Sequence, residues 1–600
     1  MSKRNGLVLG AAGLVAALVL SALVATEGPG AATRTKRATT IGASAVIAQP
    51  TPPVTASDFP MEPLGTAPTD GNGLIPNPQT PTGAPAAPPS SCTVTFSPAK
   101  HDTSATVNSW IAAHENTITS TTVVCLTGTF TDPVHVWSKS STALLEIAPA
   151  PGTTATLDLG TAVAADNNPN MYWPVAAGVS IVDSRSVEVY GLTIENLTYR
   201  GTALVPAGIA VEVRSDTTNT NQWKVPHLSA CFSNGGACSD IYLLDNTVRH
   251  ITNTADANFS TKAWCGNSNV DAYGIAVISA GHARALQHVV VEDNTVTDTR
   301  TGQSETVTFN GLITDFLAAG NRIYNTDNIG MDEIGWEVGA AQANHGYIYD
   351  NTVYNVDIYN NSSYGVWRGG KCVPLKSGEN AAGLYEDGAA YIWFNHNTVW
   401  NTNQGINLDC ETNGKYTDHL LISNNVVVDT PGTSFSDPSS GPDPPGTPGT
   451  STVAGHDPFA LYVDAFGSHA TISDVYAHDN TLVNQSQYYM APSYAMPVVA
   501  LGGIWSNVMI WHNMIEGLGP TDRYNPLFQL ETSQSGGTNT INCNDYEKLS
   551  TAAGTVDGNF ALPHEDFMTL SAWQAGNGHG WDANSEVGGF SAACPTRSRP

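Results

Sequence analysis

Four aspartates recur at one side of a repeated sequence element, and they are the residues best placed to do chemistry. Copies of the element begin at Gly274, Gly330, Gly383, Gly405 and Ala460. Position one after this residue is apolar in every copy. Side chains alternate along a strand, so positions two and four point the opposite way. Position four holds Asp387, Asp409 and Asp464 in three successive copies, and position two holds Asp332 one copy earlier.

We call these four residues the acidic file, and its carboxylates allow two kinds of chemistry. On neighbouring strands, roughly 5 Å apart, they would repel one another and raise at least one pKa, which places an acid beside a base. Alternatively, Asp387, Asp409 and Asp464 could hold Ca²⁺, which takes about six to eight oxygen ligands, and bridge it to an acidic sugar. A solvated acidic edge without a ligand is the third interpretation.

Basic residues near the acidic file are candidate bases for an elimination reaction. In that reaction a Lys or Arg removes the proton next to a sugar carboxylate. Lys415 and Arg368 are the two that we single out, and Lys371 and Lys376 lie in the same part of the chain. Loop residues that pair with the acidic excess are the alternative.

Polar and aromatic residues complete the set of candidate substrate contacts. Tyr385, Tyr462 and Asn407 occupy position two, beside the acidic file. Trp393 belongs to a second series of outward-pointing residues, which lie four positions before the repeated asparagines. Its flat ring could stack on a sugar or be covered by other parts of the protein.

Regularly spaced asparagines reveal the elements that must position these residues. An apolar stretch ending in Asn recurs at Asn196, Asn246, Asn294, Asn321, Asn351, Asn397, Asn425, Asn480 and Asn513. Two short strands per period, repeated about nine times, cannot bury a face alone and must stack on the next copy. Stacked Asn side chains would form an amide ladder. We therefore predict an all-β parallel β-helix solenoid with N- and C-terminal caps.

Composition excludes several classes of protein. The 53 acidic and 24 basic side chains give a formal charge of −29, which would repel nucleic acid phosphates. Only 13% of residues are charged and 41% are hydrophobic. The first value excludes a long coiled coil, and the second excludes global disorder. No nucleic acid partner is expected.

The N-terminal segment and the cysteines indicate export. Lys3 and Arg4 precede an apolar run from Gly6 to Ala25, so residues 1–32 are a signal peptide or a membrane anchor. The chain has nine cysteines, which in an exported protein form disulfides most economically. Our working pairing is Cys92–Cys125, Cys231–Cys238, Cys372–Cys410 and Cys543–Cys594, with Cys265 left over.

Composition shifts and the repeats divide the chain. We expect a Pro-rich linker over residues 33–91, an N-terminal cap with the first coils over 92–175, the β-helix over 176–520 and a C-terminal cap over 521–600.

Three stretches resemble known proteins. NTDNIGMDEIGWE (325–337), AAGLYEDGAAYIWFNHNTVWNTNQGINLDCE (381–411) and LSAWQAGNGHGWDANS (570–585) are similar to secreted right-handed parallel β-helix proteins of the pectate-lyase-like superfamily. The resemblance covers roughly residues 92–590 and implies that the parallel β-helix is right-handed. The superfamily hosts lyases, hydrolases, epimerases and non-catalytic spikes, so the resemblance implies architecture more than chemistry.

The sequence departs from two members of that superfamily. Asn325-Thr326-Asp327 resembles the first polygalacturonase motif, but no Asp-Asp pair follows, Gly578-His579-Gly580 lies too late and no Arg-Ile-Lys exists. The Trp-x-Asp-His run of pectate lyase is absent as well. Neither specific activity is carried over.

The sequence therefore predicts a secreted or cell-surface carbohydrate-active enzyme that cleaves an extracellular polysaccharide as a glycoside hydrolase or a polysaccharide lyase, with Ca²⁺ as a candidate cofactor. The alternative is a non-catalytic, glycan-binding or adhesive solenoid. Contact with a membrane is expected only through residues 1–32, if they are not cleaved.

Overall fold

The computed structural model describes residues 89–587 and Cys594. It leaves out 161–174, 200–204, 215–227, 254–270, 282, 303, 327, 338–340, 357–360, 369–370, 376–381, 401, 403, 430–458, 485–497, 518–526, 531–538, 549–559, 563–565 and 577–580. The predicted signal peptide or membrane anchor (1–32), residues 33–88 of the predicted linker (33–91) and Cys265 therefore lie outside the described residues.

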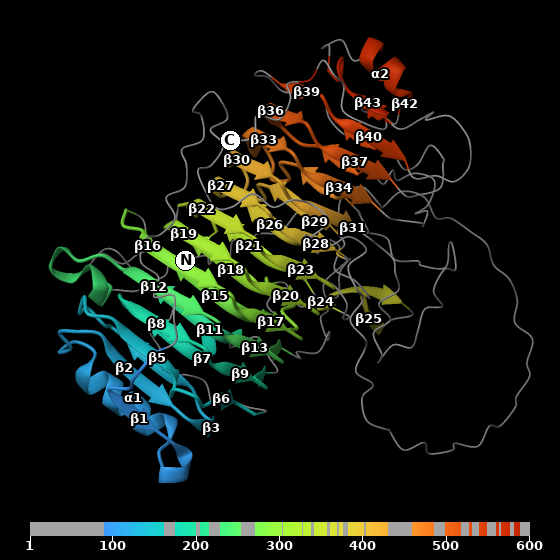
Figure 1. The fold of residues 1–600 in the computed structure, drawn as a ribbon. Helices are drawn as coiled ribbons and strands as arrows, with labels where there is room; N and C mark the ends of the chain where they lie inside the picture. Colours follow the sequence, from blue (N-terminus) through green and yellow to red (C-terminus); the bar gives the residue numbers. More distant parts are fainter. Residues whose placement is uncertain are drawn as a thin grey trace, which may run out of the picture.

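Three sheets of 13 strands each run along the molecule side by side (Figure 1). Sheet 1 contains β1 (Val94–Phe96), β2 (Thr122–Leu126), β5 (Leu145–Pro149), β8 (Val187–Tyr190), β12 (Ser239–Leu244), β16 (Leu286–Glu292), β19 (Ile313–Ala319), β22 (Asn344–Tyr349), β27 (Ala390–Asn395), β30 (Tyr416–Ser423), β33 (Thr471–His478), β36 (Trp505–Trp511) and β39 (Thr540–Asn542).

Sheet 2 contains β4 (Val134–Trp137), β7 (Val175–Val182), β11 (Val205–Val213), β15 (Tyr273–Ser279), β18 (Val307–Gly311), β21 (Met331–Ile334), β26 (Ala382–Asp387), β29 (Gln404–Asp409), β32 (Leu461–Val463), β35 (Val499–Leu501), β38 (Phe528–Leu530), β41 (Phe560–Leu562) and β42 (Asp566–Met568). Neighbouring strands are parallel in all three sheets except for β41 and β42, which pair antiparallel.

Sheet 3 contains β3 (Gly128–Phe130), β6 (Ala155–Asp158), β9 (Thr193–Glu195), β13 (Thr247–Arg249), β17 (Thr295–Thr297), β20 (Arg322–Tyr324), β23 (Thr352–Tyr354), β28 (Thr398–Trp400), β31 (Val426–Asp429), β34 (Thr481–Asn484), β37 (Met514–Gly517), β40 (Asp545–Lys548) and β43 (Glu586–Val587). Two small pairs stand apart: β10 (Thr198–Tyr199) with β14 (Thr252–Asn253), and the hairpin of β24 (Asn361–Arg368) and β25 (Lys371–Leu375).

Each coil contributes one strand to each sheet, as β26, β27 and β28 do, followed by β29, β30 and β31. Strands this short can bury one face only by closing around a shared interior. The position-one residues Met331, Leu384, Ile406 and Leu461 pair across successive strands and are fully buried in the central core. The predicted right-handed parallel β-helix is confirmed.

The amide ladder forms as expected. Asn397 accepts hydrogen bonds from the backbone N–H and side chain of Asn351, both at 3.0 Å, and donates through Nδ2 to Asn425 at 3.0 Å and to the carbonyl of Ile348 at 2.9 Å. The same pattern runs from Asn246 to Asn513 and continues to Asn544.

Two details of the ladder concern its neighbours. Asn196 is not a member: Leu192 occupies the equivalent place and donates its backbone N–H to Asn246 Oδ1 at 3.0 Å, while Asn196 Nδ2 donates to Asp158 Oδ1. The residue before each ladder Asn turns the chain in the left-handed region, as His396 (φ 57°) and His512 (φ 57°) do. These histidines are therefore turn residues.

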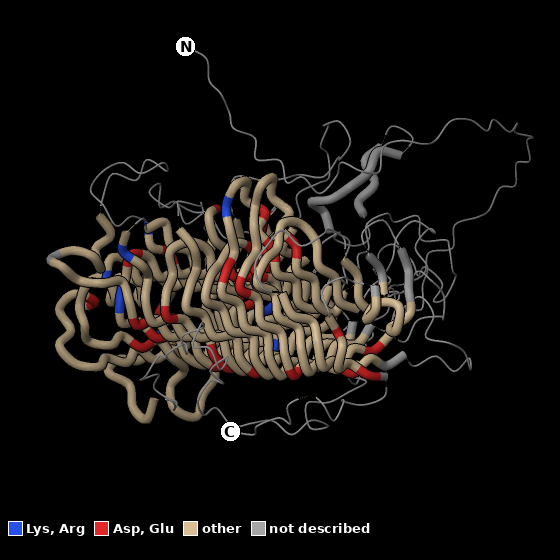
Figure 2. Tube along the Cα trace, turned by 90° about the horizontal axis from the view of Figure 1, so that it is seen from above, with Lys and Arg blue, Asp and Glu red and all other residues tan. Residues whose placement is uncertain are grey.

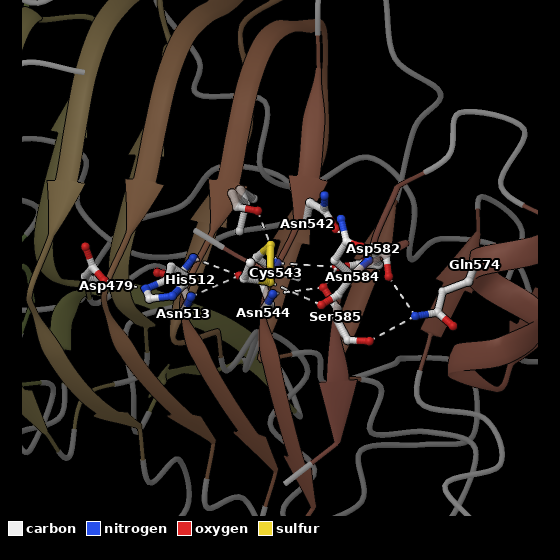
Figure 3. Close-up of a disulfide and its surroundings, with 12 residues drawn as sticks. Asp479, His512, Asn513, Asn542, Cys543, Asn544, Gln574, Asp582, Asn584 and Ser585 are labelled. Carbon is white, nitrogen blue, oxygen red and sulfur yellow. Dashed lines mark hydrogen bonds and ion pairs between the residues drawn. A yellow bond between two sulfur atoms is a disulfide. The ribbon is translucent and has the colours of Figure 1, made fainter. Parts of the chain in front are cut away.

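Both ends of the solenoid are capped. At the N-terminal end, α1 (Ser104–His114) packs against β4 and begins with a capping box between Thr103 and Thr106, which satisfies backbone N–H groups at the helix start. At the C-terminal end, α2 (Leu570–Gly576) inserts the fully buried Trp573 into the core. Figure 3 shows how the ladder stops there: Asn544 bonds to Ser585 and Asp582 instead of to another Asn.

Three predicted disulfides are confirmed: Cys92–Cys125, Cys231–Cys238 and Cys543–Cys594, the last of which is drawn in Figure 3. The pairing of Cys372 with Cys410 is wrong. Cys410 carries a free thiol that is buried among the core residues, whereas Cys372 lies on the β24–β25 hairpin. Within the described part of the chain, no helix is long and apolar enough to cross a membrane.

Candidate acidic site

The acidic file lies on the outer face of sheet 2. Asp332 pairs in register with Tyr385, Tyr385 with Asn407, and Asn407 with Tyr462. Asp387 pairs with Asp409 in the same way, and Asp464 directly follows β32 on the next coil. Figure 2 shows acidic residues gathered over these middle coils.

Burial distinguishes the acidic file from an ordinary charged surface. The four aspartates are only 2–6% exposed, so the interpretation as a solvated acidic edge is wrong. Strand alternation fixes which way a side chain points but not what covers it, which is why the sequence could not reveal this burial. Buried carboxylates must be protonated or well bonded.

Hydrogen bonds tie the acidic file to a further glutamate. The hydroxyl of Tyr385 lies 3.0 Å from Asp409 Oδ2 and 2.8 Å from Glu411 Oε1. The backbone N–H of Glu411 donates to Asp387 Oδ1 at 2.7 Å. A phenol has one proton to donate, so it can serve only one of its two carboxyl partners. The second contact is favourable when that carboxyl group carries a proton of its own.

Asp464 and Asp409 receive separate donors. The hydroxyl of Tyr462 donates to Asp464 Oδ2 at 2.9 Å, and the backbone N–H of Phe466 donates to Asp409 Oδ1 at 2.9 Å. Asp332 differs from both, because its Oδ1 is buried without a hydrogen-bond partner.

Burial is the main cause of the raised pKa values in this cluster, and like charges add to it. Burial raises the pKa of Asp387 well above its usual range, followed by the charges of Glu411 and Glu337. Burial also raises the pKa values of Asp332 and Asp409, with the charges of Glu305 and Asp464 as the next causes. Burial and mutual repulsion therefore favour the protonated form of these carboxyl groups.

Glu337 and Glu411 sit where the cluster meets solvent. Both residues keep exposed surface, yet their carboxyl ends are bonded into the cluster, Glu337 by Asn310 Nδ2 at 3.0 Å and Glu411 by Tyr385. Burial, then the charge of Glu411, raises the pKa of Glu337 to about 7. Burial also raises the pKa of Glu411, but the Tyr385 hydrogen bond opposes that shift.

We name the acidic file together with Glu337 and Glu411 the acidic site. Among the described residues, no group of three or more His, Cys, Asp or Glu side chains has the arrangement of a metal site. Asp387, Asp409 and Asp464 are already bonded to backbone N–H groups or a tyrosine hydroxyl. Binding of Ca²⁺ by these three residues stays a prediction.

The predicted substrate contacts have different positions. Tyr385, Tyr462 and Asn407 are buried beside the acidic file, where both tyrosines act as hydrogen-bond donors rather than as open platforms. Asn407 donates to Gln404 Oε1 at 2.9 Å and leaves its own oxygen without a partner.

Trp393 does not share this face. It lies on β27 of sheet 1, is buried, stacks on Tyr347 with 4.5 Å between ring centroids and donates its indole N–H to Ser423. The outward-pointing residues of this series form a packed cluster. The interpretation of Trp393 as an exposed ring on which a sugar stacks is therefore wrong.

Of the predicted bases, only Lys415 can be placed by its side chain. Its Nζ lies 4.5 Å from the centre of the Trp336 ring, next to the acidic site. Arg368 is the last residue of β24 and Lys371 is the first residue of β25. The side chains of these two residues are not described. Lys376 lies outside the described residues.

Two patterns in the sequence could have revealed the residues that the sequence-based predictions missed. Position six of the repeated element, beyond the strand end, holds Trp336, Glu411 and Phe466. Position three points inward and holds Glu333 and Glu386, which pair in register inside the solenoid and are fully buried. Both oxygens of Glu333 lack a hydrogen-bond partner.

The stacked sheets and the coil order decide the architecture. The chain is a right-handed parallel β-helix protein. No protein-family model matches it. The uncharacterized protein YwoF of Bacillus subtilis (strain 168) is 32% identical over 249 residues, which are 42% of this chain and 43% of YwoF. The match thus spans less than half of either protein.

Solved structures resemble the chain at the level of the fold. The GH136 lacto-N-biosidase of Eubacterium ramulus is 11% identical, with 74% of this chain and 64% of that one covered and a TM-score of 0.42. The A-module of the Azotobacter vinelandii mannuronan C-5 epimerase AlgE6 is 11% identical, with 82% of this chain and 95% of that one covered and a TM-score of 0.37. PfbA, a surface adhesin of Streptococcus pneumoniae, is 11% identical, with 77% of this chain and 93% of that one covered and a TM-score of 0.36.

Proposed function

We propose that this protein is an exported glycoside hydrolase that cleaves an extracellular polysaccharide at the acidic site. The observation that carries the proposal is the Tyr385 hydroxyl between Asp409 and Glu411, within a cluster of buried carboxyl groups. Hydrolysis of a glycosidic bond needs one protonated and one ionised carboxyl group close together. Such a cluster supplies both.

Asp387 is our candidate for the acid. Its pKa is raised by burial and by the neighbouring glutamates. This favours its protonated form, which can give a proton to the oxygen of the leaving sugar. The backbone N–H of Glu411 fixes the orientation of its carboxyl group.

Glu411 is our candidate for the base. It keeps solvent-exposed surface, and the Tyr385 hydroxyl stabilises its ionised form. In this role Glu411 takes a proton from the attacking water. Asp409, Asp464 and Asp332 set the charge around the pair.

The charge of the site favours a neutral glycan as substrate. An acidic sugar would be repelled by the carboxylates unless a cation neutralised it. Elimination would also need a free base, whereas the ammonium of Lys415 lies against the Trp336 ring, where the ring face attracts its charge. The three described disulfides support export, because disulfides persist in oxidising compartments.

The test is to incubate the purified chain with neutral and uronate-containing polysaccharides, with and without a chelator. Asp387→Asn removes the acid, and Asp315→Asn is the matched control. Asp315 lies on β19 of sheet 1 with φ 56°, a conformation that Asn also tolerates. We expect new reducing ends from the wild type and from Asp315→Asn, and a loss of at least about a hundredfold in rate for Asp387→Asn.

Other outcomes would contradict the proposal in recognisable ways. Unsaturated, ultraviolet-absorbing ends would identify a lyase. Loss of activity with the chelator would show that a cation such as Ca²⁺ is required. Binding without any product would identify the non-catalytic glycan-binding solenoid.

A further inference from the structure

Exposed apolar side chains gather on one edge of the solenoid. In the described part of the chain, the large apolar residues with exposed surface are Tyr416 (43%), Phe466 (39%) and Ile504 (39%). All three lie near the place where the chain passes from a sheet 2 strand to the next strand of sheet 1. Phe466 lies between β32 and β33, Ile504 lies between β35 and β36, and Tyr416 is the first residue of β30, after the passage from β29. Exposed apolar groups concentrated in one place indicate a binding surface.

These three passages stack directly on one another. The Gly414 N–H donates to the Ser468 carbonyl at 2.9 Å, which joins the first passage to the second. The N–H of Ile472, the second residue of β33, donates to the Ile504 carbonyl at 2.9 Å, which joins the strand after the second passage to the third passage. Tyr416, Phe466 and Ile504 therefore belong to three successive coils, about 4.8 Å apart along the solenoid axis.

Trp336 extends this row from two coils earlier. Its indole N–H donates to the carbonyl of Tyr416 at 2.9 Å, and the two rings meet edge to face with 5.1 Å between centroids. The intervening coil has only the two residues Gly388 and Ala389 between β26 and β27, so it does not separate them. From Trp336 to Ile504 the row spans four coil spacings, about 19 Å.

The backbone holds Trp336 in a costly conformation. Its φ is 69°, which is unusual for a bulky residue. Gln342 Nε2 braces the turn by donating to the carbonyls of Gly388 at 2.9 Å and Tyr416 at 3.0 Å. Lys415 covers the Trp336 ring. The open aromatic surface of the row is therefore that of Tyr416 and Phe466.

We name Trp336, Tyr416, Phe466 and Ile504 the aromatic rim, and it borders the acidic site. The Phe466 N–H donates to Asp409, and Trp336 directly precedes Glu337 in the chain. A ligand lying on the rim would therefore pass beside the carboxyl groups.

We propose that the aromatic rim binds a linear, neutral oligosaccharide that lies along the solenoid axis. The rim spans four coil spacings along the solenoid axis, which is longer than one sugar ring and fits a chain better than a single sugar. Sugar rings present C–H faces that pack well on flat aromatic rings. This inference rests on the proposed function for the identity of the reacting bond, but binding at the rim can be measured without any reaction.

The experiment uses Asp387→Asn as the background, so that binding is separated from cleavage. Calorimetric titration with neutral β-1,4-linked hexasaccharides of glucose, mannose and xylose, and with the corresponding monosaccharides, measures affinity. We expect a hexasaccharide to bind and a monosaccharide to bind far more weakly. Tyr416→Ala and Phe466→Ala should each weaken hexasaccharide binding about fivefold to tenfold, and Tyr416→Phe should restore it.

Tyr324→Ala is the control for general damage. Tyr324 is a partly exposed aromatic residue of sheet 3 that stacks on Tyr354, away from the rim, so its removal should leave binding unchanged. The inference is overturned if no neutral hexasaccharide binds, or if Tyr416→Ala and Phe466→Ala bind it as tightly as the background protein.

The two proposals fail in different ways. If hexasaccharide binding depends on the rim but the wild type cleaves nothing, the proposed hydrolysis is overturned and the proposed binding at the rim stands. Cleavage without any effect of the rim substitutions would do the reverse.

Discussion

Tyr385→Phe is the perturbation that separates the members of the acidic site most cleanly. It removes one buried hydroxyl and leaves the ring. That hydroxyl lies 2.8 Å from Glu411 Oε1 and opposes the burial that raises the pKa of Glu411. A hydrogen bond to a charged acceptor contributes about 1.5–3 kcal/mol. The lower value alone corresponds to about a tenfold change in the ionised fraction on the acidic side of the titration.

The measurement is kcat/KM against pH on the best neutral glycan. If Glu411 must be ionised to act as the base, Tyr385→Phe should lose about tenfold in kcat/KM on the acidic limb and little on the plateau above it. Thermal unfolding checks that the variant is folded.

Tyr462→Phe is the matched control, because its hydroxyl donates to Asp464 instead. We expect the acidic limb of this variant to stay in place. An acidic limb that does not move in Tyr385→Phe would refute the assignment of Glu411 as the base.

Three further predictions concern the interior. Asn397→Ala leaves the Ile348 carbonyl and the Asn351 N–H unpaired, so chemical denaturation should show a loss of about 3 kcal/mol or more, and an unchanged midpoint would refute the ladder's energetic role. The Glu386 side chain points into the solenoid, and burial raises its pKa. Folding therefore favours its neutral form. The stability of the protein falls as the pH rises above the ordinary carboxyl pKa toward the pKa of Glu386 in the folded protein. The stability of Glu386→Gln relative to the wild type should therefore increase as the pH rises above about 4, and a constant difference in melting temperature would count against this. Cys410 is buried and its pKa is raised by that burial, so it should resist iodoacetamide until the protein is unfolded, as mass spectrometry would detect; rapid labelling of the native protein would contradict its burial.

The fold could be predicted because its determinants are local and repeat along the chain. Each ladder Asn satisfies the backbone of the preceding coil, so the same residue is needed at every turn. Asn196 is the exception. Its sequence context resembles that of the ladder, but only the register with Asn246 shows that Leu192 takes the place.

The acidic site could be predicted only in part. Asp332, Asp387 and Asp409 lie on one face as expected, because strand alternation depends on backbone geometry alone. The contribution of Glu411 depends on how the chain turns after β29, where alternation ends. Sequence gives no direct measure of that turn.

Burial and pairing depend on long-range packing, and here the predictions failed. Trp393 points outward as its pattern indicates, but stacking on Tyr347 buries it. Cys410 was assigned to Cys372 by economy of pairing, yet it belongs to the core, where a thiol packs as a small apolar group.

The most direct test of the central claim is a crystal structure of Asp387→Asn with a neutral hexasaccharide bound. We expect a glycan that lies along the solenoid axis over Tyr416 and Phe466, with one glycosidic oxygen within hydrogen-bond distance of residue 387. A glycan bound away from Tyr416, Phe466 and Glu411, for example on sheet 3 or beside Trp393 of sheet 1, would contradict the claim.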